Sequence, residues 1–250
     1  MKRFMNVLFA MLITVCIAGG AHATPLSDLF NGGSIIAGDK LFDNWSQVRY
    51  MTSDSTRSLN AANISVTALN DGGMDPGPGL RFSVSNGELN VTGDGIYGFV
   101  DLMFGFRVSV LDPTLRIKDN SLEYAAGGAF WSVMLDGSYD SGSYIREDIG
   151  TASGLADLGT KFIEFSTMGD PQSSTSITSA SAAFAPQSEI WVTKNILVWA
   201  VGEEDGAGIF GFEQRFSQTP AVPEPSTLLL LGGGLAGLAV LRKKMGGRAK

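Results

Sequence analysis

The chain has 250 residues and a formal charge of −7, with 18 Lys and Arg residues against 25 Asp and Glu residues. Seven of the basic residues and one acid lie in residues 1–23 and 221–250, so residues 24–220 carry a formal charge of −13, which argues against nucleic-acid binding. The only cysteine, Cys16, and the only histidine, His22, precede residue 24, which excludes disulfides, Ser-His-Asp or Cys-His catalysis and His- or Cys-ligated metals after it.

The first 23 residues have the three parts of a secretory signal peptide. Two basic residues follow Met1, residues 4–20 are largely apolar, and Ala21 and Ala23 have the small-x-small spacing of a signal peptidase site. We therefore expect the secretion translocon and signal peptidase to deliver a chain that begins at Thr24.

Residues 24–220 show the alternation of apolar and polar residues that is typical of β-strands. The alternation is clear in residues 80–84, 104–110 and 190–200, and Asn-Gly and Asp-Gly pairs separate the runs, as tight turns require. About ten strands at this spacing predict an all-β fold, a single β-sandwich ectodomain over residues 24–220 that could be jelly-roll-like.

Two segments of this region fit the strand pattern less well. No long amphipathic helix is predicted, and residues 152–160 are the segment that could form a short one. The Ser-, Thr- and Ala-rich residues 171–183 are expected to form either a long loop or an edge strand.

The C-terminal segment, residues 221–250, combines a Pro-Glu-Pro triplet, an uncharged apolar span (227–241) and a basic tail (242–250). As a helix the span would measure about 22 Å, which is short for a hydrocarbon core of about 30 Å. The basic cluster at its end would lie in the cytoplasm, so we expect a marginal transmembrane helix that holds the ectodomain outside the inner membrane as a sorting intermediate. The triplet is Pro223, Glu224 and Pro225, and the membrane-stop cluster is Arg242, Lys243 and Lys244.

This order of triplet, span and basic tail resembles the PEP-CTERM sorting signal of bacteria that produce exopolysaccharide. The resemblance covers about the last 28 residues. It implies that an exosortase, a membrane-embedded cysteine transpeptidase, recognises the triplet and processes the chain near it. Two prolines suit that role, because they keep the site extended and remove a competing backbone donor. The resemblance also implies delivery to the cell surface or the extracellular (biofilm) matrix, with a β-rich ectodomain of no established activity.

For the ectodomain the sequence leaves several functions open. The leading interpretation is a structural or exopolysaccharide-associated protein that is not an enzyme and needs no cofactor. The alternative is a carbohydrate-binding, lectin-like module, because Trp and Tyr rings stack on sugar rings. Tyr139 and Tyr144, in a Gly- and Ser-rich segment, are the candidate sugar contacts, whereas Trp131 and Trp191 fall in alternating runs and are expected in the core.

Two further alternatives rest on carboxylates. Acidic, Gly-rich turns could bind calcium through carboxylate and carbonyl oxygens, although none has the spacing of an EF-hand. A glycoside hydrolase needs two carboxylates at a fixed separation, but the 24 acids of residues 24–220 single out no pair, so no catalytic residue is predicted. The calcium candidates are Asp71, Asp75, Asp136 and Asp140.

Overall fold

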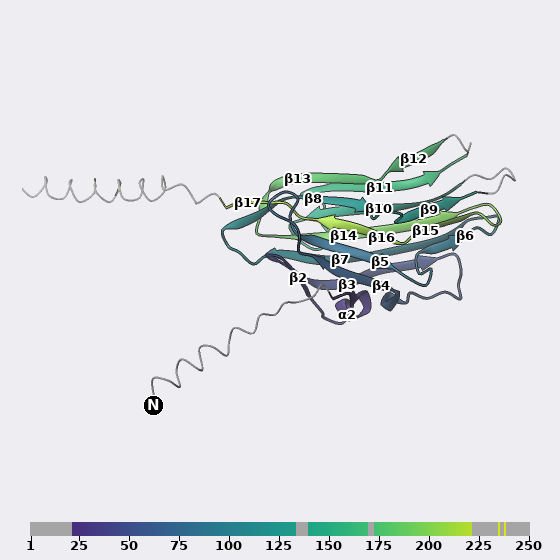
Figure 1. Cartoon of the computed structure of the whole chain (residues 1–250), viewed down its shortest axis with the longest axis horizontal. Coiled ribbons are helices and arrows are strands. Elements are labelled where there is room, and N and C mark those ends of the chain that lie inside the picture. Colours follow the sequence, from purple (N-terminus) through teal and green to yellow (C-terminus); the bar gives the residue numbers. More distant parts are fainter. Residues whose placement is uncertain (1–21, 134–139, 170–172, 222–234, 236–237, 239–250) are drawn as a thin grey trace, which may run out of the picture.

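A computed structural model of the protein describes residues 22–133, 140–169 and 173–221, together with residues 235 and 238 (Figure 1). These residues lie mostly in antiparallel β-strands, and two seven-stranded sheets pack face to face as a sandwich. The predicted all-β sandwich is therefore confirmed. The chain passes repeatedly from one sheet to the other, as in Greek-key and jelly-roll sandwiches.

The first sheet has the strand order β1-β4-β5-β16-β8-β13, and β17 pairs with β8 beyond this path. Every pairing in this sheet is antiparallel. Its strands are β1 (Thr24–Pro25), β4 (Ile64–Leu69), β5 (Gly79–Val84), β8 (Leu115–Tyr124), β13 (Ser179–Gln187), β16 (Gly211–Arg215) and β17 (Gln218–Pro220).

The second sheet has the strand order β12-β11-β10-β14-β7-β3-β2 and is also antiparallel throughout. A small third sheet, β6-β15-β9, completes one end of the sandwich. The second sheet contains β2 (Ile35–Ala37), β3 (Lys40–Thr52), β7 (Gly98–Val110), β10 (Ser141–Gly150), β11 (Gly159–Thr167), β12 (Ser174–Ile177) and β14 (Glu189–Ala200). The third contains β6 (Asn90–Thr92), β9 (Ala129–Ser132) and β15 (Gly206–Ile209).

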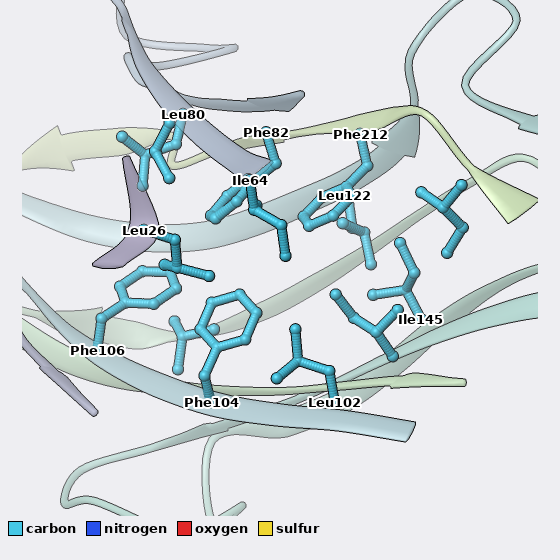
Figure 2. Close-up of a cluster of buried hydrophobic side chains, with 14 of the residues drawn as sticks. Leu26, Ile64, Leu80, Phe82, Leu102, Phe104, Phe106, Leu122, Ile145 and Phe212 are labelled. Atoms are coloured by element: carbon cyan, nitrogen blue, oxygen red, sulfur yellow. The ribbon is translucent and has the colours of Figure 1, made fainter. Parts of the chain in front are cut away.

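The hydrophobic core lies between the two large sheets, and β7 shows how the sequence produces it. Every second side chain from Val100 to Val108 is fully buried, because successive side chains of a strand point to opposite faces of the sheet. Figure 2 shows Phe104 of this strand across from Phe82 and Phe212 of the first sheet. The rings of Phe82 and Phe212 stack with their centroids 4.5 Å apart. Buried aromatic pairs of this kind contribute strongly to the stability of a core.

Two of the local expectations can be compared with the structure. Residues 152–160 do not form the expected helix: residues 152–158 connect β10 to β11, and Gly159 and Thr160 are the first residues of β11, which pairs with β10 as its antiparallel neighbour. The carboxylate of Asp157 closes this connection by accepting hydrogen bonds from the backbone N–H (2.8 Å) and hydroxyl (2.7 Å) of Thr151. Of the two forms expected for residues 171–183, the edge strand is the correct one, since β12 and β13 each lie at the edge of a sheet.

Short helical elements close the N-terminal side of the sandwich. Helix α2 (Leu26–Phe30), which the sequence pattern did not predict, contacts β3 and β4 and buries Leu26 and Leu29 completely. A 3₁₀ turn, η1 (Ala61–Asn63), lies beside it. Within the described part of the chain no helix is long and apolar enough to cross a membrane, and the expected span, residues 227–241, falls outside that part except for two positions.

The long strands give the sandwich two distinct ends. Figure 1 places β17, where the C-terminal segment begins, at one end, and β6 and β15 at the other. Strand β14 contacts β6 and β15, so its last residues lie at the end far from β17.

Candidate functional site

The outer face of the second sheet, formed by the side chains of β11, β10, β14 and β7 that point away from the core, mixes aromatic and hydrogen-bonding groups. Strand register brings them together. Tyr144 on β10 lies opposite Leu197 on β14 and Glu164 on β11. Two residues along β10, Arg146 lies opposite Phe162 on β11. Residues spaced by two share a face of a strand, so these side chains lie on the same surface.

Tyr144 and Phe162 form an aromatic pair on this face. Their ring centroids are 5.4 Å apart, and Phe162 is 39% exposed while Tyr144 is half-buried. Burial raises the pKa of the Tyr144 hydroxyl, with Glu164 raising it further and Arg146 opposing the change. The phenol therefore keeps its proton at neutral pH and can both donate and accept a hydrogen bond.

Charged groups around the aromatic pair are held in place by one another. Arg146 forms an ion pair with Asp148 (3.0 Å), and the Thr160 hydroxyl donates to the same carboxylate (2.8 Å). Farther along the same sheet, beyond β14, Asp101 on β7 pairs with Arg49 on β3 at 2.6 Å. The face therefore offers fixed donors and acceptors as well as rings.

A shallow cavity of about 300 Å³ lies at the end of this face that is far from β17. Tyr97 and Met168 line it and are 42% and 56% exposed. Burial raises the pKa of Tyr97, and the charge of Asp101 raises it further. The cavity combines apolar walls with few polar groups, as small-molecule sites usually do. Its lining residues are Tyr97, Asp140, Met168, Leu197, Trp199 and Val201.

The aromatic residues that the sequence assigned to sugar contact or to the core lie in several different places. Tyr144 lies on the outer face, and Tyr139 falls outside the described residues. Trp131 packs against the core as expected, but Trp191 does not: it is half-buried and lies opposite Arg107 on the outer face. Phe162, the most accessible ring of the aromatic pair, was not among the expected contacts, because its outward direction depends on the register of β11.

The acidic residues considered for calcium have other partners. Both carboxylate oxygens of Asp71 accept hydrogen bonds from Arg215 (3.0 and 3.2 Å), and Asp75 pairs with Lys118 (2.7 Å). These hydrogen bonds lower the pKa of each carboxyl group. No group of three or more His, Cys, Asp or Glu side chains that could hold a metal occurs among the described residues. Asp140 lines the cavity, and Asp136 lies outside the described residues, so calcium binding stays a prediction.

The residues predicted to direct export fall almost wholly outside the described part of the chain. Ala23 is described, immediately before β1. The others are Ala21, Pro223, Glu224, Pro225, Arg242, Lys243 and Lys244.

Several solved structures show a weak likeness to the chain. The carbohydrate-binding module TmCBM61, solved with β-1,4-galactotriose, is 12% identical with a TM-score of 0.22, covering 71% of this chain and 89% of that chain. The enzymatically active domain of tailspike protein 4 of bacteriophage CBA120 is 11% identical with a TM-score of 0.24, covering 71% of this chain and 19% of that chain. A carbohydrate-binding module described as belonging to the β-sandwich superfamily is 11% identical with a TM-score of 0.20, covering 81% of this chain and 63% of that chain. At such TM-scores these structures do not indicate what this chain binds.

Sequence comparison identifies the C-terminal segment. Curated proteins provide no significant match to the chain. Residues 221–244, however, match the family model described as the PEP-CTERM protein-sorting motif, and the match includes both the Pro-Glu-Pro triplet and the basic cluster. The motif implies an exosortase as processing partner and passage through the membrane for surface display. The chain is therefore an exported protein that carries a C-terminal PEP-CTERM sorting motif.

Proposed function

We propose that the ectodomain is a polysaccharide-binding surface protein, which uses the outer face of its second sheet to hold exopolysaccharide after exosortase-dependent sorting. The proposal includes no catalytic step. The observation that carries it is the partly exposed Tyr144–Phe162 ring pair, set among fixed carboxylate and guanidinium groups. Sugar rings present apolar C–H faces and hydroxyl edges, so a surface that binds them needs both kinds of group.

The position of the cavity supports the proposal. The cavity continues the outer face at the end of the sandwich far from β17, after which the sorting segment begins. A chain attached or processed at its C-terminus would thus keep this end directed away from the attachment point. Tyr97 adds another exposed ring at this end, and the largely buried Trp199 forms part of the cavity wall.

Binding to exopolysaccharide purified from the producing bacterium tests the proposal. We expect the double variant Tyr144→Ala/Phe162→Ala to bind at least about tenfold more weakly than the wild-type protein, since losing about 1.4 kcal/mol of contact is enough for that change. The measurement is affinity electrophoresis at a series of polysaccharide concentrations.

The matched control is Phe210→Ala, which removes another exposed ring (47% exposed) that stacks on Phe130 away from the outer face. Its binding should equal that of the wild type. A wild-type protein that binds no polysaccharide would leave a purely structural role for the ectodomain. A double variant that binds as tightly as the wild type would show that this face is not the binding surface.

We also expect the exported protein to begin at Thr24. Thr24 lies opposite Val66 in the first pair of strands, so cleavage after Ala23 leaves the fold complete. N-terminal sequencing of protein recovered outside the inner membrane makes the measurement. A chain that begins at Met1 or inside α2 would contradict the signal-peptide prediction. The variant Ala23→Leu should not be cleaved, because the leucine side chain is too large for the peptidase pocket.

A further inference from the structure

Three charged side chains point into the core in a row across the second sheet. Glu147 on β10 lies opposite Lys161 on β11 and Lys194 on β14. Glu147 and Lys194 are fully buried and Lys161 is 5% exposed. One oxygen of Glu147 contacts Lys194, and the other lies 2.5 Å from the amine of Lys161. Lysines are almost never buried in this way unless they are paired.

Side chains of the first sheet, an amide and two aromatic rings, contact this row of charged residues. Asn120, on β8, is fully buried, and its side-chain oxygen accepts a hydrogen bond from the amine of Lys161. The amine of Lys194 lies over the rings of Phe82 and Phe212, 5.4 and 5.1 Å from their centroids. The side chains of Phe82 and Phe212 lie between the sheets in Figure 2. The cluster therefore joins the two halves of the sandwich through an amine–amide contact.

The charges of the cluster balance only if one lysine is neutral. Two ammonium groups against the single carboxylate of Glu147 would leave a net positive charge in the core, which is strongly unfavourable. Lys194 has the carboxylate and two aromatic faces to stabilise a cation. Burial holds the pKa of both lysines well below the usual range, and Asp119 opposes the change at Lys161. The two differ in their other contacts, because Lys161 lies against the neutral amide of Asn120 and has no aromatic ring among the described residues to stabilise a cation. Lys161 is thus the neutral amine, and a neutral desolvated lysine is a nucleophile.

The amide that this amine contacts is incompletely paired. The side-chain nitrogen of Asn120 is buried and has no hydrogen-bond partner among the described residues. One oxygen of Glu147, although close to Lys161, also lacks a hydrogen bond of normal geometry. Buried unpaired polar groups are rare in native proteins and call for an explanation. A reaction that removes the amide nitrogen would supply one.

We propose that Lys161 and Asn120 join in an intramolecular isopeptide bond between the two sheets, with Glu147 carrying the proton. The amine nitrogen of Lys161 attacks the side-chain carbonyl carbon of Asn120 and forms the new C–N bond. Glu147 takes one proton from the attacking nitrogen and gives it to the side-chain nitrogen of Asn120. The bond between that nitrogen and the carbonyl carbon then breaks, and one molecule of ammonia leaves. No oxidant, reductant or other reactant is required.

A second buried lysine offers an internal comparison. Lys40 on β3 donates to the side-chain oxygen of Gln218 on β17, so it too joins the sheets through an amine–amide contact. Its carboxylate partner, Asp39, is 20% exposed and adjacent in sequence, at 3.0 Å. Burial lowers the pKa of Lys40 as well, but the hydrogen bond to Asp39 and the charge of that carboxylate oppose the change. Asp39 is partly exposed, whereas Glu147 is fully buried and is placed to carry a proton within the core. We therefore expect the reaction only at Lys161.

Peptide mass spectrometry of the full-length chain tests the proposal. After complete unfolding and digestion with trypsin, an unmodified chain gives separate peptides 119–146, 147–161 and 162–194. The isopeptide bond blocks cleavage after Lys161, so the wild-type chain should give one branched product, 119–146 joined to 147–194, lighter than the sum of its parts by one ammonia molecule. Complete conversion to this product is expected.

Two variants and one control make the result specific. Asn120→Ala and Glu147→Gln should give the separate peptides, because the first lacks the reacting carbonyl and the second lacks the proton carrier. Lys40→Met should keep the branched product. Should either of the first two variants fail to fold, the wild-type digest still decides the matter. Separate peptides 147–161 and 162–194 from the wild-type chain would overturn the proposal and leave a buried ion-pair cluster only.

Discussion

Replacing Pro223, Glu224 and Pro225 together with Ala is expected to trap the protein in the inner membrane with its C-terminal segment still attached. These residues form the triplet of the matched sorting motif, and the substitution leaves the apolar span and the basic cluster unchanged. The extended, proline-fixed backbone that the processing enzyme would recognise is lost, whereas the membrane anchor remains. Fractionation of cells that contain the exosortase, with mass spectrometry of the C-terminus, gives the measurement.

Deleting residues 227–250 is the complementary change. The span and basic cluster are then absent, so the ectodomain should be released to the periplasm as a soluble protein rather than trapped. Normal trimming and surface delivery of the triple-Ala variant would show that the triplet is not recognised and that the segment acts only as an anchor.

The sequence predicted the all-β sandwich because alternation and turn signals depend on local spacing. In β7, every second residue from Val100 to Val108 is apolar and is buried as the alternation indicates. The expectation of a helix over residues 152–160 was wrong, because that segment is the connection between two paired strands together with the first two residues of the second. Its conformation is set by the strands on either side rather than by local propensity.

The two functional clusters could not be predicted in the same way. Phe162 and Lys161 are adjacent in sequence, but strand alternation directs the first outward and the second into the core. The direction of a charged residue such as Lys161 is not suggested by composition, since lysine is usually exposed. Its contact with Asn120 depends on how the two sheets pack, which involves residues 41 positions apart.

A covalent link between the sheets would suit a protein exported without cysteine. The only cysteine precedes the predicted cleavage site, so the mature ectodomain has no disulfide to stabilise it outside the cell. An isopeptide bond between Lys161 and Asn120 would fulfil the same role and would not be reducible. It would form from residues that are already in the core, without any added enzyme.

Asn120→Ala is expected to lower the free energy of unfolding by about 4 kcal/mol, on the chain-entropy model of cross-links. The bond would close a loop between residues 41 positions apart, and the cross-linked chain has correspondingly less entropy to gain on unfolding. Equilibrium unfolding of the purified full-length chain in guanidinium chloride gives the measurement. Equal unfolding free energies for wild type and Asn120→Ala would contradict the cross-link.

The unfolding free energy of the same variant should also rise more steeply with pH than that of the wild type. In Asn120→Ala the amine of Lys161 stays free, and burial keeps its folded-state pKa well below the 10.5 of an exposed lysine. Between those two values the unfolded chain binds a proton that the folded chain does not, so stability should rise with pH by about 1.4 kcal/mol per unit. Glu147, Lys194 and Asp119, the charged groups around Lys161, are present in both proteins, so the titratable group that differs between them is the Lys161 amine. Lys161→Met lacks both the bond and the amine, so its unfolding free energy should be low and should follow the wild-type pH profile.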